Sequence, residues 1–204
     1  MKVTNLDELE VLIQKVKAAQ AEFATYTQEQ VDRIFKQAAL AANAARIPLA
    51  KAAVKESGMG VIEDKAIKNH FASEMIYNKY KNDKTCGIIE SDRHFGYERI
   101  AEPVGLLAGI VPVTNPTSTT IFKSLISLKT RNGIIFSPHP RAKSCSAAAA
   151  KIMLDAAVAA GAPPDIIGWI DEPTVPLSQA LMQHHDIKLI WLFCTCCAKM
   201  LVKC

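Results

Sequence analysis

The sequence contains no hydrophobic run that approaches the roughly 20 residues needed by a membrane-spanning helix. Its first ten residues, MKVTNLDELE, lack the apolar segment of a signal peptide and include acidic residues, which are scarce in transit peptides. These absences predict a cytoplasmic protein with no membrane partner. Half of the 204 residues are hydrophobic and 22% are charged, a balance typical of a globular protein with a real core.

An excess of charge of one sign is also missing. The net charge is only +4, and Lys and Arg are interspersed with Asp and Glu, so no nucleic-acid partner is expected. Neither the G-x-G-x-x-G pattern nor the Walker A pattern occurs, which excludes the two standard glycine-rich phosphate loops. A nucleotide site would have to be built in another way.

The first 84 residues have the apolar spacing of amphipathic helices. A first helix is indicated by the face Leu6, Leu9, Ile13 and Val16. Thr27 and Gln30 form a capping box for a second helix, whose apolar stripe is Val31, Ile34, Phe35, Ala38 and Ala39. Pro48 suits the first turn of a third helix and Gly58 its end. A fourth helix is expected from Ile62 to Tyr80, with Ile67, Phe71 and Met75 on one side.

The remaining sequence predicts an arm and then an α/β unit. Residues 85–103 are more polar and include Gly87 and Gly96, which indicates one or two strands leaving the main body. Apolar strands are then expected at 106–111, 133–136, 166–170 and 187–192, with helices at 116–129, 143–160 and 177–183. Strands without polar alternation, separated by helices, predict a Rossmann-like parallel sheet covered on both faces.

Ligands of such sheets bind at the carboxyl ends of the strands, and two turns there are unusual. Residues 111–119, VPVTNPTST, offer Thr114 or Asn115 as a helix N-cap before Pro116. A helix N-terminus attracts phosphate or an oxyanion, and the Asn115 amide could donate to a developing oxyanion. The same residues could equally serve only to cap the helix.

The second turn, residues 136–143, reads FSPHPRAK and places prolines on both sides of His139. Such a turn is rigid and is expected to present Ser137 and His139 outward, either as the rim of a nucleotide site or as a stiff surface turn.

No metal site is expected. His184 and His185 have no ligand spacing to a second cluster and are predicted to be solvated loop residues. Cys145 lies in an Ala-rich helix and is predicted to be a small buried hydrophobe. Cys194, Cys196 and Cys197 lack the paired C-x-x-C spacing of thiolate metal sites.

At these two turns the chain resembles a known family. IVPVTNPTSTTIFKSLISLKTRN and IIFSPHPRAK are similar to the nucleotide-binding half of the CoA-acylating aldehyde dehydrogenases. More narrowly, they resemble the N-terminal part of the bifunctional aldehyde-alcohol dehydrogenases of fermenting bacteria. The resemblance extends through ESGMG, EDKAIKNHFASE, YNKYK, KTCG, AAGAPPDIIGWID and HHDIKLI, which covers residues 1 to about 190.

The resemblance implies an oxidoreductase with an aldehyde dehydrogenase fold. The reaction would convert acetyl-CoA and NADH reversibly into acetaldehyde, CoA and NAD through a cysteine thioester. Asn115 would help to hold the thioester or hemithioacetal oxygen, and Ser137 would stand where the oxidising relatives usually have a lysine. The segment along NAD would be Ile110, Val111, Pro112, Val113, Thr114 and Asn115, and the adenosine end would meet Ser137, Pro138 and His139.

The resemblance stops at Trp191. The family continues there with a Gly-rich turn, whereas WLFCTCCAKMLVKC contains no glycine and four cysteines. We therefore expect a helical region at 1–84, an arm at 85–103, a partial NAD-binding domain at 104–190 and an aberrant tail at 191–204. A truncated chain of this kind would lack the nucleophilic cysteine, bind NAD weakly or not at all, and show no turnover by itself.

Two further hypotheses about the chain remain open. The chain could act as a non-catalytic binding or oligomerisation module, pairing with itself or with a full-length enzyme through the exposed edge of an incomplete sheet. Alternatively, the tail could fold into a cap that completes a small autonomous domain.

Overall fold

The N-terminal third is a row of helices, as the sequence predicts. The structure, a computed structural model, describes residues 2–192 and 200–202. The helices are α1 (Leu6–Phe23), α2 (Gln28–Ala44), α3 (Arg46–Ser57), α4 (Ile62–His70) and α5 (Ile76–Tyr80). A π-helical segment, η1 (Phe71–Met75), joins α4 to α5, so the predicted fourth helix is continuous but has one widened turn.

The predicted helix boundaries have the expected chemistry. The Thr27 and Gln30 capping box is present at α2, and Gly58 ends α3 in the left-handed conformation at φ 66°. The predicted α2 stripe is fully buried. On α1 the prediction is wrong for Leu6, which is 57% exposed because the buried face of this helix begins at Leu9.

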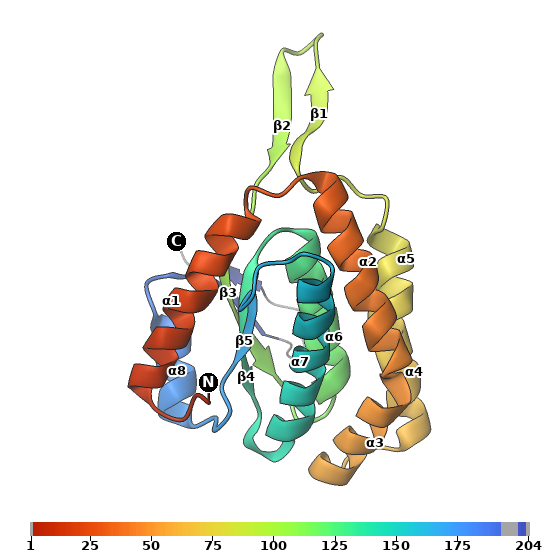
Figure 1. Ribbon diagram of the computed structural model, residues 1–204, viewed down its shortest axis with the longest axis vertical. Coiled ribbons are helices and arrows are strands. Elements are labelled where there is room, and N and C mark those ends of the chain that lie inside the picture. Colours follow the sequence, from red (N-terminus) through yellow and green to blue (C-terminus); the bar gives the residue numbers. More distant parts are fainter. Residues whose placement is uncertain (1, 193–199, 203–204) are drawn as a thin grey trace.

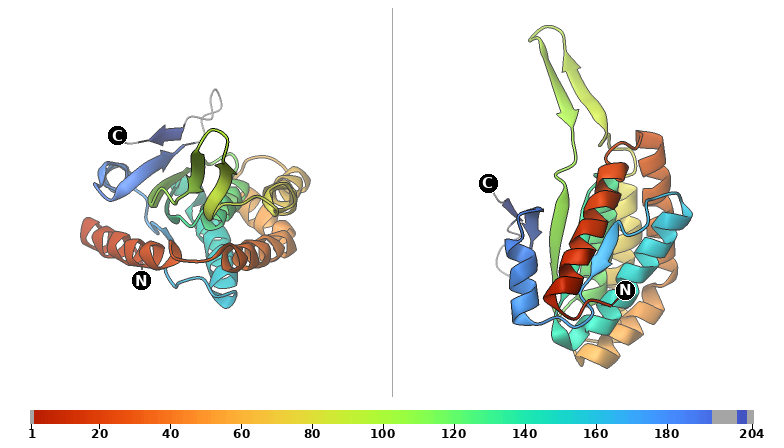
Figure 2. Two further views of the ribbon diagram at one scale, coloured as in Figure 1. Left: turned by 90° about the horizontal axis from the view of Figure 1, so that it is seen from above. Right: turned by 60° about the vertical axis from the view of Figure 1, so that its left-hand side comes forward.

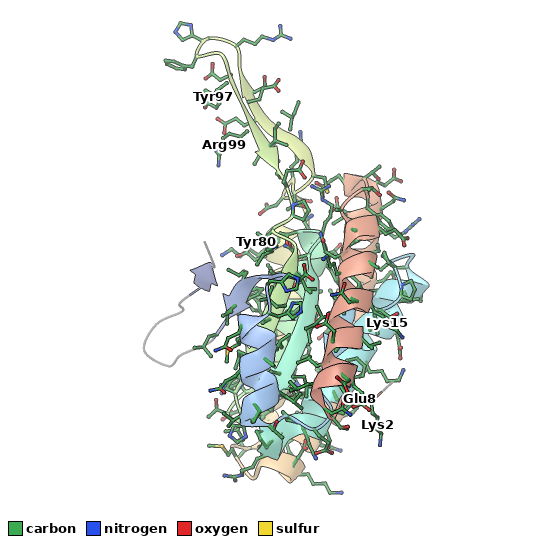
Figure 3. All side chains as sticks on the ribbon, turned by 90° about the vertical axis from the view of Figure 1, so that its left-hand side faces the viewer. Lys2, Glu8, Lys15, Tyr80, Tyr97 and Arg99 are labelled. Carbon is green, nitrogen blue, oxygen red and sulfur yellow. The ribbon has the colours of Figure 1, made fainter. Side chains whose placement is uncertain are left out.

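Residues 85–103 form the predicted arm. Strands β1 (Gly87–Asp92) and β2 (Tyr97–Ala101) pair antiparallel in a hairpin that projects from the body (Figure 1). Tyr97 and Arg99 lie on this arm, away from the body (Figure 3). At its base the Arg131 guanidinium donates to the carbonyl oxygens of Ala101 (2.8 Å) and Ala24 (2.6 Å), which ties the arm to the end of α1.

The second part is the predicted parallel sheet. Its strands are β3 (Leu106–Val111), β4 (Gly133–Pro138), β5 (Ile167–Trp169) and β6 (Ile187–Trp191), in the spatial order β5-β4-β3-β6. The helices between them are α6 (Pro116–Lys129), α7 (Lys143–Ala159) and α8 (Val175–Gln183), with a short 3-10 turn, η2 (Pro140–Ala142), before α7. The prediction of four strands alternating with helices is confirmed.

Helices cover both faces of the sheet (Figure 2). Because side chains alternate along a strand, Leu106 and Ala108 face the cluster that includes residues of α1 and α8. Leu107 and Val111 face the opposite cluster, which includes residues of α2, α6 and α7. The packing leaves no room at Gly109, where a Cβ atom would lie 2.8 Å from the Phe136 ring. Since a hydrophobic cluster lies on each face, the prediction of a sheet covered on both faces is confirmed.

A fifth strand follows β6, so on this side the edge of the sheet lies at that strand and not at β6. Residues Met200–Val202 form β7, which pairs antiparallel with β6. Residues 193–199, 203 and 204, with Cys194, Cys196, Cys197 and Cys204, lie outside the described residues, so the predictions about the cysteines of this tail have no structural outcome. Among the described residues, no helix is both long and apolar enough to cross a membrane.

A side chain of α3 caps the N-terminus of α7. The residue at the N-cap position, Ala142, has no capping side chain, and the backbone N–H groups of Ser144 and Cys145 instead donate to the Glu56 carboxylate at 2.8 and 2.7 Å. Partial burial pushes the pKa of Glu56 upward, but these donors outweigh burial and hold that pKa below its ordinary value of 4.5.

Replacing Glu56 should therefore destabilise the fold in a pH-dependent way. A carboxylate with a lowered folded-state pKa stabilises above its ordinary pKa, and this contribution is lost as the pH falls below about 4.5. We expect Glu56→Gln to lower the free energy of unfolding by about 1 kcal/mol at pH 7. The deficit should shrink in acid. Chemical denaturation at pH 7 and pH 3.5 measures it, with the exposed Glu63→Gln as control; an equal deficit at both pH values would contradict the assignment.

Candidate functional site

The two predicted turns lie side by side at the carboxyl end of the sheet. Strands β3 and β4 pair in register, with Ile110 opposite Ser137 and Val111 opposite Pro138. The pairing continues one residue further, because the backbone N–H of His139 donates to the carbonyl oxygen of Val111 at 3.0 Å. The turns that follow β3 and β4 are separated in the sequence by the whole of α6, yet they start next to each other.

A large groove opens beside the first turn. It has a volume of about 690 Å³ and lies between this turn, the start of α6 and the outer side of α4 and η1. Its walls combine apolar side chains with hydroxyl and amide groups. The lining residues are Ile67, Lys68, Phe71, Ala72, Pro112, Thr114, Asn115, Ser118, Thr119 and Phe122. We call it the first groove. Its apolar residues Ile67 of α4 and Phe71 of η1 are 66% and 59% exposed, so this side of α4 and η1 is not part of the hydrophobic core.

Three side chains of α4 hold the first turn. Lys65 Nζ donates to the carbonyl oxygen of Thr114 at 2.5 Å, and Lys68 Nζ donates to Asn115 Oδ1 at 3.1 Å. The fully buried Asn69 accepts from the Thr117 hydroxyl at 2.8 Å and donates to the carbonyl oxygen of Arg46 at 3.0 Å. Residues 114–117 are therefore fixed from a separate helix.

Asn115 occupies the N-cap position of α6 but does not cap it with its side chain. Its oxygen is engaged by Lys68, and within the described residues no hydrogen bond from its Nδ2 is found. The simple capping interpretation therefore does not explain this side chain. Its role toward an oxyanion stays a prediction.

A second groove of about 260 Å³ lies near the other turn, and we call it the second groove. It is lined by Pro140, Pro173, Thr174, Val175, Ser178, Gln179 and Met182. The prediction that Ser137 points outward is wrong: Ser137 is 3% exposed, because β4 continues to Pro138 and keeps it inside the strand. Its hydroxyl lies 2.7 Å from the hydroxyl of Ser178, a residue of the second groove.

The other predicted residues have structural contacts. Val113 packs against a small cluster formed by Ala53, Ala142 and Cys145, and it does not line either groove. Pro138 is buried at the end of β4. His139 is half-buried, and its Nδ1 accepts from the backbone N–H of Arg141 at 3.1 Å, which caps η2. Of the predicted residues, Pro112, Thr114 and Asn115 reach a groove directly.

Lys123 is a buried residue of α6 that lies at the carboxyl ends of β3 and β6. Its Nζ donates to the carbonyl oxygens of Ile110 (2.7 Å) and Trp191 (2.5 Å), and it lies 5.7 Å from the centre of the Trp191 ring. Burial lowers the pKa of Lys123 to about 7. The side chain joins the ends of β3 and β6.

Neither described cysteine, Cys86 or Cys145, lines a groove. Cys145 is buried as predicted, and burial together with the nearby Glu56 carboxylate raises the pKa of its thiol to about 12. Cys86 is half-buried and lines neither groove.

The histidine pair is engaged in local contacts. The prediction of solvated loop residues is wrong for His184, whose side chain is 14% exposed because it packs against α1, with Nε2 3.0 Å from Glu10. Its Nδ1 accepts from the backbone N–H of Asp186, and Asp186 pairs with Lys17 at 2.7 Å. His184, His185 and Asp186 bring ligand atoms within 4.8 Å of one another, but these contacts already use His184 and Asp186.

The sequence pattern of the aldehyde dehydrogenase family matches residues 2–194, nearly the whole chain. The chain belongs to the aldehyde dehydrogenase family. It is 68% identical over 190 residues to the bifunctional aldehyde-alcohol dehydrogenase of Escherichia coli K12. That alignment covers 93% of this chain and 21% of the relative, so the chain spans about a fifth of the relative's length.

Solved structures of this family share the fold. The acetylating aldehyde dehydrogenase of Geobacillus thermoglucosidasius superposes with a TM-score of 0.89 at 46% identity, covering 91% of this chain and 41% of that one. The propionaldehyde dehydrogenase of Rhodopseudomonas palustris, solved with bound CoA and an acylated cysteine, gives 0.75 at 26% identity, with 89% and 41% covered. An engineered glycolyl-CoA reductase with bound NADP+ gives 0.75 at 25% identity, with the same coverage.

Sequence reasoning missed several residues of both grooves. The sequence alone assigns no role to Lys65, Lys68 and Asn69 of the predicted fourth helix. Their spacing of i, i+3 and i+4 puts three polar residues on one helix face, and this was the signal that could have indicated them. Ser178 and Gln179 gave no comparable signal, because their relation to the second turn depends on how α8 packs.

Lys123 should give the folded chain a characteristic pH dependence. Between about pH 7 and the ordinary lysine pKa of 10.5, the unfolded chain holds a proton that the folded chain has released, so the contribution of this group to the free energy of unfolding rises with pH. We expect Lys123→Met to remove that rise. Denaturation at pH 6.5, 8 and 9.5 measures it, with the exposed Lys55→Met as control; an unchanged slope in Lys123→Met would refute the assignment.

Proposed function

We propose that this chain forms the substrate-facing and cofactor-facing wall of an acylating acetaldehyde dehydrogenase. The reaction is the reversible conversion of acetyl-CoA and NADH into acetaldehyde, CoA and NAD. The observation that carries the proposal is the first groove. It combines apolar side chains with Asn115, which stands at the N-cap position of α6 but does not use its side chain to cap the helix. Membership of the family and the CoA-bound structural neighbour support the same substrate class.

The first groove suits an acyl thioester. Ile67, Phe71 and Phe122 offer apolar surface to an acyl chain and the thioester sulfur. Asn115 and the hydroxyls of Ser118 and Thr119 add hydrogen-bond donors to the lining of the same groove. An amide N–H directed at a carbonyl oxygen stabilises the negative charge that this oxygen gains when a nucleophile adds. Asn115 is thus assigned to the oxyanion.

The second groove suits the adenosine end of a nicotinamide cofactor. It is lined by Pro140, Thr174, Ser178 and neighbouring residues, and the Ser178 hydroxyl lies against that of the buried Ser137. The segment from Ile110 to Thr114 leads from this region toward the first groove, so the rest of the cofactor would follow Ile110, Val111, Pro112, Val113 and Thr114. Pro138 and His139 shape the turn between the grooves. The cofactor, when bound, supplies or accepts the hydride.

The described residues offer no cysteine thiol in the first groove, because Cys145 is buried with a raised thiol pKa and Cys86 lies elsewhere. Thioester chemistry requires a thiolate at the reacting carbon. We therefore assign to the isolated chain binding of acetyl-CoA without turnover.

Two measurements on the purified chain test this assignment. With NADH and acetyl-CoA, NADH absorbance should not fall in an acetyl-CoA-dependent way, whereas calorimetry should detect acetyl-CoA binding. Ile67→Glu should weaken binding about tenfold or more, since it places a charge in the apolar wall. Ile47→Glu, at a similarly exposed isoleucine of α3 outside the groove, should have no effect. Turnover, or equal binding by both variants, would overturn the assignment.

The arm favours a second function, association between chains. Ile88 and Ile100 are 52% and 58% exposed and lie opposite each other in the hairpin register, and Phe95 at its tip is 76% exposed. Apolar side chains on a projecting hairpin are a typical contact surface for a second copy or for a full-length relative.

Substitution on the arm should abolish this association. We expect the chain to elute from size-exclusion chromatography as more than a monomer, and Ile100→Glu to shift it toward the monomer because the charge cannot be buried in the interface. Ile47→Glu is again the matched control. A wild-type chain that elutes as a monomer at all concentrations would count against the arm as an interface.

A further inference from the structure

The first groove contains a cation whose position has a chemical consequence for Asn115. Lys68 is exposed, lines the groove and donates to Asn115 Oδ1 at 3.1 Å. An ammonium group has three donors and no acceptor, so only the oxygen of a side-chain amide can face it. Rotating the amide by half a turn would set its NH2 group against the ammonium. Lys68 therefore selects one of the two orientations of the Asn115 amide.

The selected orientation leaves the donor end of the amide available. Asn115 lines the groove, does not cap α6, and has no hydrogen bond from Nδ2 within the part of the chain that the structure describes. A positive charge at the oxygen also polarises the amide and strengthens its N–H groups as donors. The arrangement favours an anionic or partly anionic oxygen as the acceptor.

The neighbouring contacts keep this geometry rigid. Lys65, one turn before Lys68, is 5% exposed and fixes the carbonyl oxygen of Thr114, the residue before Asn115. Burial, to which the charge of Lys68 adds, lowers the pKa of Lys65. Asn69 fixes Thr117 two residues after Asn115. The backbone on both sides of Asn115 is thus held by α4, and the amide orientation is the remaining degree of freedom.

We propose that Lys68 is a positioning residue, which fixes the side-chain amide of Asn115 with its oxygen toward α4 and its N–H groups toward the thioester oxygen of the substrate. The first part, orientation, concerns the chain alone. The second part, donation to a thioester, rests on the proposed function. Lys68 acts on the reaction through Asn115 and does not need to touch the reacting atoms.

Side-chain NMR of the 15N-labelled full chain tests the orientation without any ligand. We expect the Asn115 NH2 group of the wild type to be ordered, and Lys68→Met to lower its order parameter into the range of flexible groups, below about 0.6. Lys68→Arg, which keeps a donor cation, should restore the order. Lys36→Met, at an exposed lysine of α2, should leave it unchanged. An Asn115 amide that stays ordered in Lys68→Met overturns the orientation.

Acetyl-CoA binding tests the donor role. Removing one positioned hydrogen bond should weaken binding by up to about tenfold in Lys68→Met, and Lys68→Arg should recover it. Asn115→Asp separates packing from donation, because it replaces the Lys68 contact by an ion pair but removes the N–H groups. Its stability should hold or rise while acetyl-CoA binding falls at least as far as in Lys68→Met.

The outcomes of the two assays are separable. Unchanged acetyl-CoA affinity in both Lys68→Met and Asn115→Asp would overturn the donor role. If the wild-type chain binds no acetyl-CoA, the proposed function fails, while the orientation is still decided by the NMR comparison.

Discussion

The parallel pairing of β3 with β4 is the constraint on which the site depends. It continues past the strands through the hydrogen bond from His139 N–H to the Val111 carbonyl oxygen, so both turns leave the sheet from one point. This single register places the start of α6 beside α4 and the start of α7 beside Glu56. A shift of one residue would move Ser137 away from Ser178 and Asn115 away from Lys68.

Regular elements could be predicted because their causes are local. The apolar runs of β3 and β4, the Thr27 capping box and Gly58 each act within a few residues, and each appears where expected. The exposure of Ser137 was mispredicted for a related reason: two prolines mark a turn, but they do not say whether the strand ends before or after Ser137. β4 in fact continues to Pro138, and the Ser137 hydroxyl contacts Ser178 of α8, far along the chain.

The site itself is mostly non-local. Each α4 contact with the first turn joins residues 47 to 49 positions apart, and a sequence does not show which face of a helix will meet which turn. Three of the buried basic residues follow the same logic. Lys65, Lys123 and Arg131 are held by backbone carbonyl oxygens, which every residue possesses, so no partner residue type in the sequence points to them.

The π-helical segment η1 gives the first groove a further property. A π turn holds one residue more than an α turn, and such turns occur often at functional sites. Phe71 and Ala72 of η1 line the groove, whereas Lys65, Lys68 and Asn69 precede it in regular α4. The loss of a single residue in η1 can therefore be absorbed by closing this π turn into an α turn. Such a change would shift the apolar side chains of η1 in the groove while Lys65, Lys68 and Asn69 kept their register in α4.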